Sequence, residues 1–267
     1  MTPIQAQSLP FIIDGKDVIG QGKTGSGKTA AFGLGVLNSL NVKLFRVQSL
    51  ILCPTRELAD QVAKEVRKLG RTIHNIKVLT LCGGVPLGPQ VGSLEHGAHI
   101  IVGTPGRIED HLRKGTLNLE HVKTLVLDEA DRMLDMGFQS VLDAIVEQVP
   151  KQRQTLLFSA TFPDQIQKIA QRIMKQPVMA KVEETHDSSS IKQYFYTVEN
   201  TAHRFTALQL LLLNHSPTST VVFCNTKRET QEVADQLIDS GFSALALHGD
   251  LEQKDRDKTL VRFANRS

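Results

Sequence analysis

Residues 22–29 read GKTGSGKT, and this stretch decides the fold of the 267-residue chain. It follows a short apolar run at 17–20, which predicts a strand, and it opens a helical pattern at 29–40. A glycine-rich turn between a strand and a helix directs backbone N–H groups and the positive helix end at one point. The spacing G-x-x-x-x-G-K-[ST] therefore predicts a nucleotide phosphate site formed by Gly22, Lys23, Thr24, Gly25, Ser26, Gly27, Lys28 and Thr29.

Short β-branched apolar runs alternate with longer amphipathic patterns on both sides of this phosphate loop. Six runs predict strands, at 17–20, 49–53, 77–81, 99–102, 124–127 and 155–159, with helices between them, as at 56–70 and 106–114. Several of these runs are apolar on both faces, as in a parallel sheet covered by helices. The alternation predicts βαβ units and a doubly wound α/β sheet.

The pattern lapses at 183–190, where EETHDSSS predicts an interdomain linker between domains at 1–182 and 191–267. The second domain repeats the alternation, with strands expected at 193–198, 220–224 and 243–247. Helices are expected at 202–214, 227–240 and 251–264. Three strands are roughly half of a matching sheet, so we expect a second domain that is cut short.

Composition narrows the classes of function. Hydrophobic residues at 40 % and charged residues at 22 % exclude wholesale disorder, and no apolar run approaches the length of a membrane span. Three cysteines lie far apart, which indicates reduced core residues and neither a disulfide framework nor a metal site. Residues 1–182 carry 22 Lys and Arg against 16 Asp and Glu, an excess compatible with a phosphate-rich partner.

A second polar cluster, Asp128-Glu129-Ala130-Asp131, follows the apolar run at 125–127. Carboxylates at the end of a strand lie at the sheet edge where the phosphate loop also opens. We expect Asp128, with Thr29, to hold Mg²⁺, and Glu129 to orient and deprotonate an attacking water. Lys28 completes this catalytic set at the β- and γ-phosphates. The alternative is an acidic helix N-terminus stabilised by the helix dipole, which the neighbouring phosphate loop disfavours.

These motifs resemble those of the DEAD-box ATP-dependent RNA helicases, whose name is the sequence at 128–131. The resemblance extends along the chain and implies that Gln5 pairs with the edge of adenine. It also implies that Ser159, Ala160 and Thr161 couple the state of ATP to unwinding. The residues it implies for RNA-backbone contact are Pro54, Thr55, Arg56, Gly83, Gly84, Thr104, Pro105, Gly106, Arg107, Thr226, Gly249 and Arg256. Taken singly, these are ordinary turn, loop and capping residues, and only their order favours the helicase interpretation.

The resemblance implies a RecA-like fold followed by a partial second RecA-like domain. It implies RNA-stimulated ATP hydrolysis with Mg²⁺, coupled to local duplex unwinding, by a cytoplasmic monomer. LCPTRELADQV, DEADRMLDMGF and LHGDLEQKDRD are closest to the bacterial DbpA type, which acts on large-subunit ribosomal RNA and suggests a role in ribosome assembly. Contacts to the RNA backbone would be sequence-tolerant and sensitive to salt. Two alternatives are an ATP-binding RNA clamp without unwinding activity, and a phosphate-loop ATPase that acts on DNA or protein.

The chain departs from the family pattern near both ends. The aromatic residue that family members stack on adenine is missing upstream of Thr2, and the later arginines that stabilise the transferring phosphoryl group are missing too. The C-terminal RNA-binding domain of the DbpA type is likewise not among these 267 residues. Losing such arginines removes about 10³ to 10⁵ in rate. We therefore expect ATP binding with very slow hydrolysis, little stimulation by RNA and no unwinding.

Overall fold

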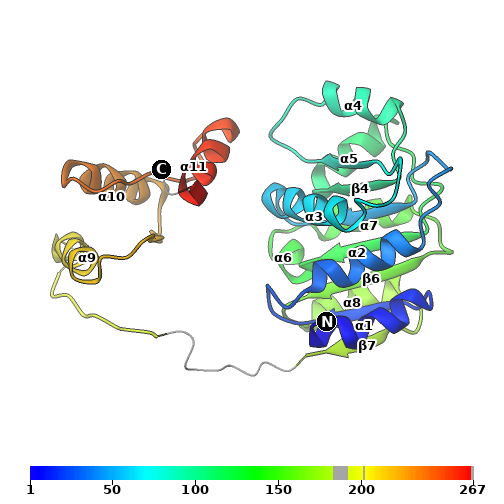
Figure 1. Ribbon diagram of the computed structural model, residues 1–267, viewed down its shortest axis with the longest axis horizontal. Helices are drawn as coiled ribbons and strands as arrows, with labels where there is room; N and C mark the ends of the chain where they lie inside the picture. Colours follow the sequence, from blue (N-terminus) through cyan, green and yellow to red (C-terminus); the bar gives the residue numbers. More distant parts are fainter. Residues whose placement is uncertain (183–191, 201, 266–267) are drawn as a thin grey trace. The chain divides into compact units, whose positions relative to one another are not determined.

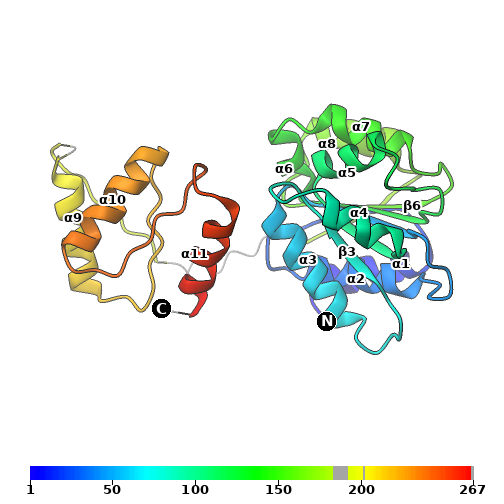
Figure 2. The same cartoon turned by 90° about the horizontal axis from the view of Figure 1, so that it is seen from above.

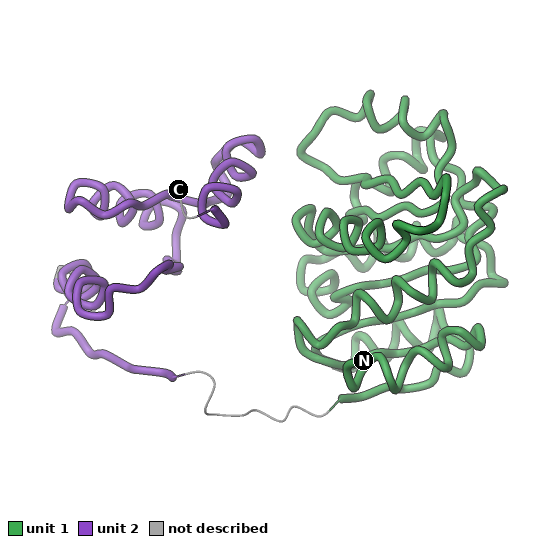
Figure 3. Tube along the Cα trace, in the orientation of Figure 1, with its two compact units in different colours: residues 1–186 green, residues 187–267 purple. Residues whose placement is uncertain are grey.

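The computed structural model describes residues 1–182, 192–200 and 202–265. The chain forms two compact units, residues 1–186 and 187–267 (Figure 3). The linker predicted at 183–190 lies outside the described residues.

The first unit is built on a seven-stranded parallel sheet with the strand order β3-β4-β2-β5-β6-β1-β7 (Figure 1). The strands are β1 (Val18–Gln21), β2 (Ser49–Leu52), β3 (Val78–Leu81), β4 (Ile100–Gly103), β5 (Thr124–Asp128), β6 (Gln154–Ser159) and β7 (Val178–Lys181). The six predicted strands are confirmed with small shifts at their ends. β7 is not predicted, because it is a short, largely exposed edge strand that depends on pairing with β1.

Helices cover both faces of this sheet. One face carries α1 (Pro3–Ile13), α2 (Lys28–Asn38) and α3 (Arg56–Leu69), and the other carries α5 (Pro105–Arg113), α6 (Ala130–Asp135), α7 (Gln139–Glu147) and α8 (Asp164–Ile173) (Figure 2). Helix α4 (Gly88–Glu95) packs near β3. Successive strand residues enter opposite core layers: Ile51 packs with Phe32 and Val62, and Leu52 packs with Ile108. Burial on both faces explains the continuous apolar runs and confirms the RecA-like fold class.

The second unit contains α9 (Ala202–His215), α10 (Lys227–Asp239) and α11 (Gln253–Asn265), which confirm the three expected helices. The strands predicted at 193–198, 220–224 and 243–247 are wrong, since none of the residues described in this unit is in a strand. A β-prone segment becomes a strand only when its backbone pairs with a neighbour and one face is covered. Neither condition is met at 220–224, where the Phe223 side chain is 93 % exposed.

Candidate nucleotide and RNA site

Three predicted segments meet at the carboxyl edge of the sheet, because β5, β6 and β1 are neighbours. Gln21 at the end of β1 pairs with Ser159 at the end of β6, and the Gly22 amide donates to the Ser159 carbonyl at 3.1 Å. Asp128 at the end of β5 pairs with Phe158 of β6. The phosphate loop, the acids at 128–131 and the segment at 159–161 are therefore adjacent. Open α/β sheets bind ligands at this edge.

The phosphate loop encloses the side chain of its own lysine. Lys28 Nζ donates to the carbonyls of Gly22 at 2.5 Å and of Lys23 at 3.0 Å. Burial lowers the pKa of the Lys28 ammonium, and the nearby charges of Asp128 and Glu129 oppose this effect. The remaining loop residues are Thr24, Gly25, Ser26 and Gly27, and Thr29 lies in the first turn of α2. The ammonium and the helix N-terminus together favour an anion at this loop.

Gln5, the predicted adenine-reading residue, lies against the phosphate loop. Its Oε1 accepts from the Thr2 amide at 3.0 Å, and its Nε2 donates to the Gly27 carbonyl at 3.2 Å. Gly27 has a φ of 94°, and a Cβ there would lie 2.6 Å from Gln5 Nε2, so only glycine fits. Gln5 thus retains a second N–H and a second oxygen lone pair for the edge of adenine, and this pairing stays a prediction.

Asp128 is a buried carboxylate at the end of β5. Burial raises its pKa to about 7, although the Lys28 ammonium opposes this shift and Glu129 adds to it. The Glu129 amide donates to Asp128 Oδ1 at 3.1 Å. A carboxylate that is costly to ionise without a cation suits a metal-binding role, so the donor set fits Mg²⁺.

Glu129 occupies a strained backbone position beside Asp128. Its φ of 51° and ψ of 52° place it in the left-handed region, which is uncommon for residues other than glycine. Its carboxylate lies 3.5 Å from Arg132 Nη1, one turn along α6. Such strain gathers at functional sites, where it aims a side chain.

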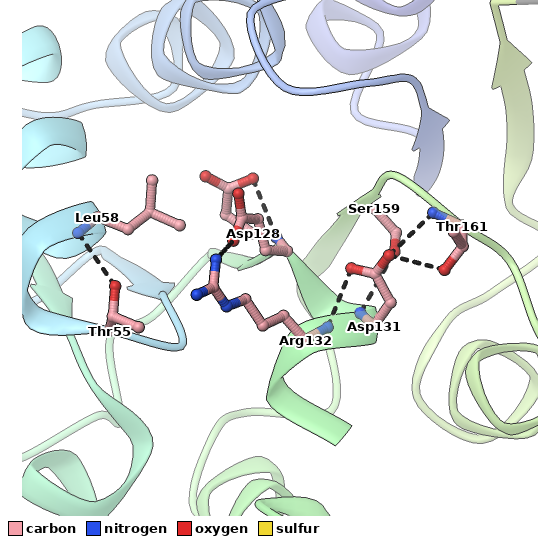
Figure 4. Close-up of polar contacts among 8 residues, drawn as sticks. Thr55, Leu58, Asp128, Asp131, Arg132, Ser159 and Thr161 are labelled. Atoms are coloured by element: carbon pink, nitrogen blue, oxygen red, sulfur yellow. Dashed lines mark hydrogen bonds and ion pairs between the residues drawn. The ribbon is translucent and has the colours of Figure 1, made fainter. Parts of the chain in front are cut away.

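Asp131 joins the acid cluster to the segment at 159–161 (Figure 4). Its Oδ2 accepts from the Thr161 amide at 2.9 Å and from the Thr161 hydroxyl at 2.7 Å, and its own amide donates to Ser159 Oγ at 3.3 Å. Ala160 between them is exposed. Asp131 is a residue that our sequence-based set of site residues omitted. The signal was present, since acids and hydroxyls follow two strands that proved to be neighbours.

The predicted RNA segments of the first unit follow the other half of the sheet, where β2, β4 and β3 are neighbours. Pro54, Thr55 and Arg56 follow β2, Gly83 and Gly84 follow β3, and Thr104, Pro105, Gly106 and Arg107 follow β4. A Cβ on Gly83 or Gly106 would meet no atom within 4 Å, so the backbone at both glycines faces open space. Pro54 and Pro105 are buried, so they fix the course of the backbone and offer no surface to RNA.

Two of these side chains already have structural partners. Thr55 caps α3, because its hydroxyl accepts from the Leu58 amide at 3.3 Å. Arg107 Nη2 donates to the Val85 carbonyl at 2.9 Å, while its Nε and Nη1 are buried without a hydrogen-bond partner among the described residues. These two donors can bind a phosphate oxygen once movement of the Arg107 side chain uncovers them.

The second unit brings together the RNA residues predicted there. Thr226 caps α10 by accepting from the Glu229 amide at 3.1 Å. Arg256 donates to the carbonyls of Gly249 at 2.5 Å and of Leu251 at 3.1 Å. Contact of these residues with RNA stays a prediction.

The structure also bears on the cysteines, on metal-binding groups of side chains and on membrane-spanning helices. Cys53, Cys82 and Cys224 are free thiols, and burial raises the pKa of Cys82 to about 11. Among residues 1–182, 192–200 and 202–265, no group of three His, Cys, Asp or Glu side chains could hold a metal ion. Within the same ranges, no helix is long and apolar enough to cross a membrane.

Comparison with known proteins supports the helicase interpretation of these motifs. The sequence profile of DEAD/DEAH box helicases matches residues 2–169, and that of the helicase conserved C-terminal domain matches residues 203–267.

Two curated relatives match almost the whole chain. It is 57 % identical to the ATP-dependent RNA helicase DbpA of Escherichia coli over 267 residues, which are all of this chain and 58 % of that protein. It is 47 % identical to the DEAD-box ATP-dependent RNA helicase CshA of Geobacillus kaustophilus over 262 residues, which are 98 % of this chain and 56 % of that protein. The chain thus spans little more than half the length of these relatives.

A solved structure shares the fold. The crystal structure of a DEAD box protein from the hyperthermophile Methanococcus jannaschii superposes with a TM-score of 0.65 at 41 % identity, covering 99 % of this chain and 71 % of that one. The chain belongs to the DEAD/DEAH box helicase family.

Proposed function

We propose that this chain forms part of the motor of an ATP-dependent RNA helicase, a protein in which RNA-stimulated ATP hydrolysis separates short RNA duplexes locally. One observation carries the proposal: one sheet edge holds a phosphate loop on β1 and an acid cluster on β5, joined through Ser159 and Thr161 of the segment after β6. The RNA segments follow the adjacent strands β2, β4 and β3. A change in the bound nucleotide can therefore be transmitted to the RNA segments through contacts along this one edge of the sheet.

Each residue of the nucleotide site has its own role in ATP binding and hydrolysis. Lys28 and the backbone amides at the start of α2 bind the phosphates, and Gln5 reads adenine. Bound Mg²⁺, held by Thr29 and Asp128, would neutralise charge on the β- and γ-phosphates. Glu129, held at its strained backbone position, orients the attacking water and accepts its proton.

The RNA segments of the first unit supply backbone donors and the guanidinium groups of Arg56 and Arg107. The backbone is open at Gly83 and Gly106 and exposed at Gly84, and two donors of Arg107 have no partner among the described residues. These groups suit phosphate oxygens and 2′-hydroxyls, so binding is tolerant of sequence and weakened by salt.

The finer part of the proposal concerns biological context. We infer large-subunit ribosomal RNA as the substrate and ribosome assembly in the cytoplasm as the setting, for a monomer with domains at 1–182 and 191–267. This inference is supported by the resemblance of residues 52–62, 128–138 and 247–257 to the DbpA type.

A second candidate is an ATP-binding RNA clamp that does not unwind. It is favoured by the location of the phosphate loop and three RNA segments within the first unit alone. The rate of ATP hydrolysis with and without RNA, measured in a chain extended to the length of its curated relatives, separates the two candidates. A stimulated rate that Glu129→Gln lowers by about 10² or more, while the exposed control Glu120→Gln does not, supports the helicase. Binding of ATP and RNA without any stimulated rate supports the clamp.

A further inference from the structure

The loop that carries Gly83 and Gly84 is tied to helix α5 at both ends. Arg107 and His111 are four residues apart on α5, so they lie on the same face of that helix. Arg107 Nη2 donates directly to the carbonyl of Val85, at one end of the loop. His111 reaches the other end, at Cys82, through a side chain of α4.

Gln90 of α4 forms this second tie. Its Nε2 donates to the Cys82 carbonyl at 2.9 Å, and its Oε1 lies 3.0 Å from His111 Nε2. An amide oxygen can only accept, so the proton of neutral His111 is on Nε2. The Thr116 hydroxyl, 2.8 Å from His111 Nδ1 and 3.2 Å from the His111 carbonyl, then donates its one proton to the nearer Nδ1.

The chain of hydrogen bonds lies inside the protein. His111 is fully buried and Gln90 is 9 % exposed. Burial, followed by the nearby charge of Arg107, lowers the pKa of His111 and keeps the ring neutral. A buried polar chain whose members are all satisfied fixes one arrangement, because breaking any link leaves a donor or acceptor unpaired.

We propose that Gln90 and His111 are positioning residues for RNA binding. They hold the carbonyl of Cys82 so that the amides of Gly83 and Gly84 stand beside Arg107, which makes two separate RNA segments one rigid unit. This inference rests on the proposed function, because it assumes that these segments contact RNA. Neither positioning residue lies in a segment that the sequence motifs singled out.

Replacement of Gln90 gives the first test, in the full chain. Gln90→Met keeps the length of the side chain and removes both hydrogen bonds, and Gln148→Met, at an exposed position after α7, is the control. Without RNA, we expect the amide ¹⁵N order parameters of 83–85 to fall in Gln90→Met, from about 0.85 toward 0.6, while those of 22–28 stay unchanged. Affinity for a labelled single-stranded RNA should fall about fivefold to tenfold with ADP affinity unchanged.

Replacement of His111 by a residue that keeps or removes the donor gives the second test. His111→Gln retains a donor near the position of Nε2 and should keep most of the RNA affinity, whereas His111→Leu should lose it. The ¹⁵N spectrum of His111 in the parent should show the proton on Nε2.

Three results would overturn the inference. They are unchanged order parameters at 83–85 in Gln90→Met, an equal loss of ADP and RNA affinity, and a proton on Nδ1 of His111. A parent chain that binds no RNA would refute the proposed function and the RNA-binding role of the two residues. The relaxation experiment would still show whether Gln90 orders the loop.

Discussion

Replacing Asp131 by Asn weakens the link between the acid cluster and the segment after β6. The carboxylate accepts three hydrogen bonds, two at Oδ2 from Thr161 and one at Oδ1 from the Arg132 amide at 3.0 Å. Asn keeps one accepting oxygen, and its NH₂ group cannot accept. Hydrogen bonds to a charged group contribute about 1.5 to 3 kcal/mol and neutral ones about 0.5 to 1.5 kcal/mol. Because the site is partly exposed, we expect a net loss of about 1 to 2 kcal/mol in the free energy of unfolding.

The same link predicts a dependence on pH. Burial raises the pKa of the Asp131 carboxyl, but the hydrogen bonds with Thr161, Ser159 and the Arg132 amide together outweigh this effect and hold that pKa below the ordinary value of 3.8. A carboxyl whose pKa is lower in the folded state contributes stability above its unfolded pKa and loses that contribution as pH falls through the folded pKa. The difference between parent and Asp131→Asn should therefore be full near neutral pH and should shrink in acid below 3.8.

Urea unfolding followed by far-ultraviolet circular dichroism measures this difference in the free energy of unfolding, once near neutral pH and once below pH 3.8. Asp135→Asn, at an exposed carboxylate at the end of the same helix, is the matched control and should cost little. Equal losses in the two variants would refute the reasoning, as would a loss in Asp131→Asn that is undiminished in acid.

Three further predictions concern the nucleotide. Lys28→Ala should abolish binding of a fluorescent ADP while Lys43→Ala, at an exposed side chain outside the loop, retains it, and equal affinities in the two folded variants would contradict the phosphate site. Gln5→Ala should reduce the preference for ADP over GDP in a competition assay, since a buried mismatched amide costs about 1 to 3 kcal/mol, and a parent without preference would contradict the role. Gly27→Ala, at a φ of 94°, places a Cβ 2.6 Å from Gln5, whereas Gly15→Ala also has a positive φ, of 77°, but open space around the Cβ. Gly27→Ala should therefore lower the melting temperature and ADP affinity more than Gly15→Ala, and equal effects would show that the contact with Gln5 is unimportant.

The phosphate loop and the acid cluster were predictable because each is a local pattern at the end of an apolar run. The order of the strands was not, because parallel strands pair with neighbours far away in sequence. Asp131 and Thr161 are 30 residues apart and meet only because β5 lies beside β6. Gln90 and His111 carry no motif at all, since their role depends on how α4 and α5 pack against the end of β3.

In the second unit, local sequence patterns predicted strands that the structure does not form. The run at 220–224 has the β-branched and aromatic residues of a strand, but propensity is expressed only where a neighbouring strand and a covering layer exist. The helices were predicted correctly there, because a helix makes its backbone hydrogen bonds within its own segment.

The central claim is that one sheet edge carries two separable sites, with ATP at the ends of β1, β6 and β5 and RNA at the ends of β2, β4 and β3. The most direct test is to measure fluorescent ADP and labelled single-stranded RNA binding in Lys28→Ala and Arg107→Ala, with folding checked by circular dichroism. We predict that Lys28→Ala loses ADP and keeps RNA, and that Arg107→Ala keeps ADP and loses RNA affinity by about tenfold. Two folded variants that both retain both ligands, or that both lose both, would contradict the account.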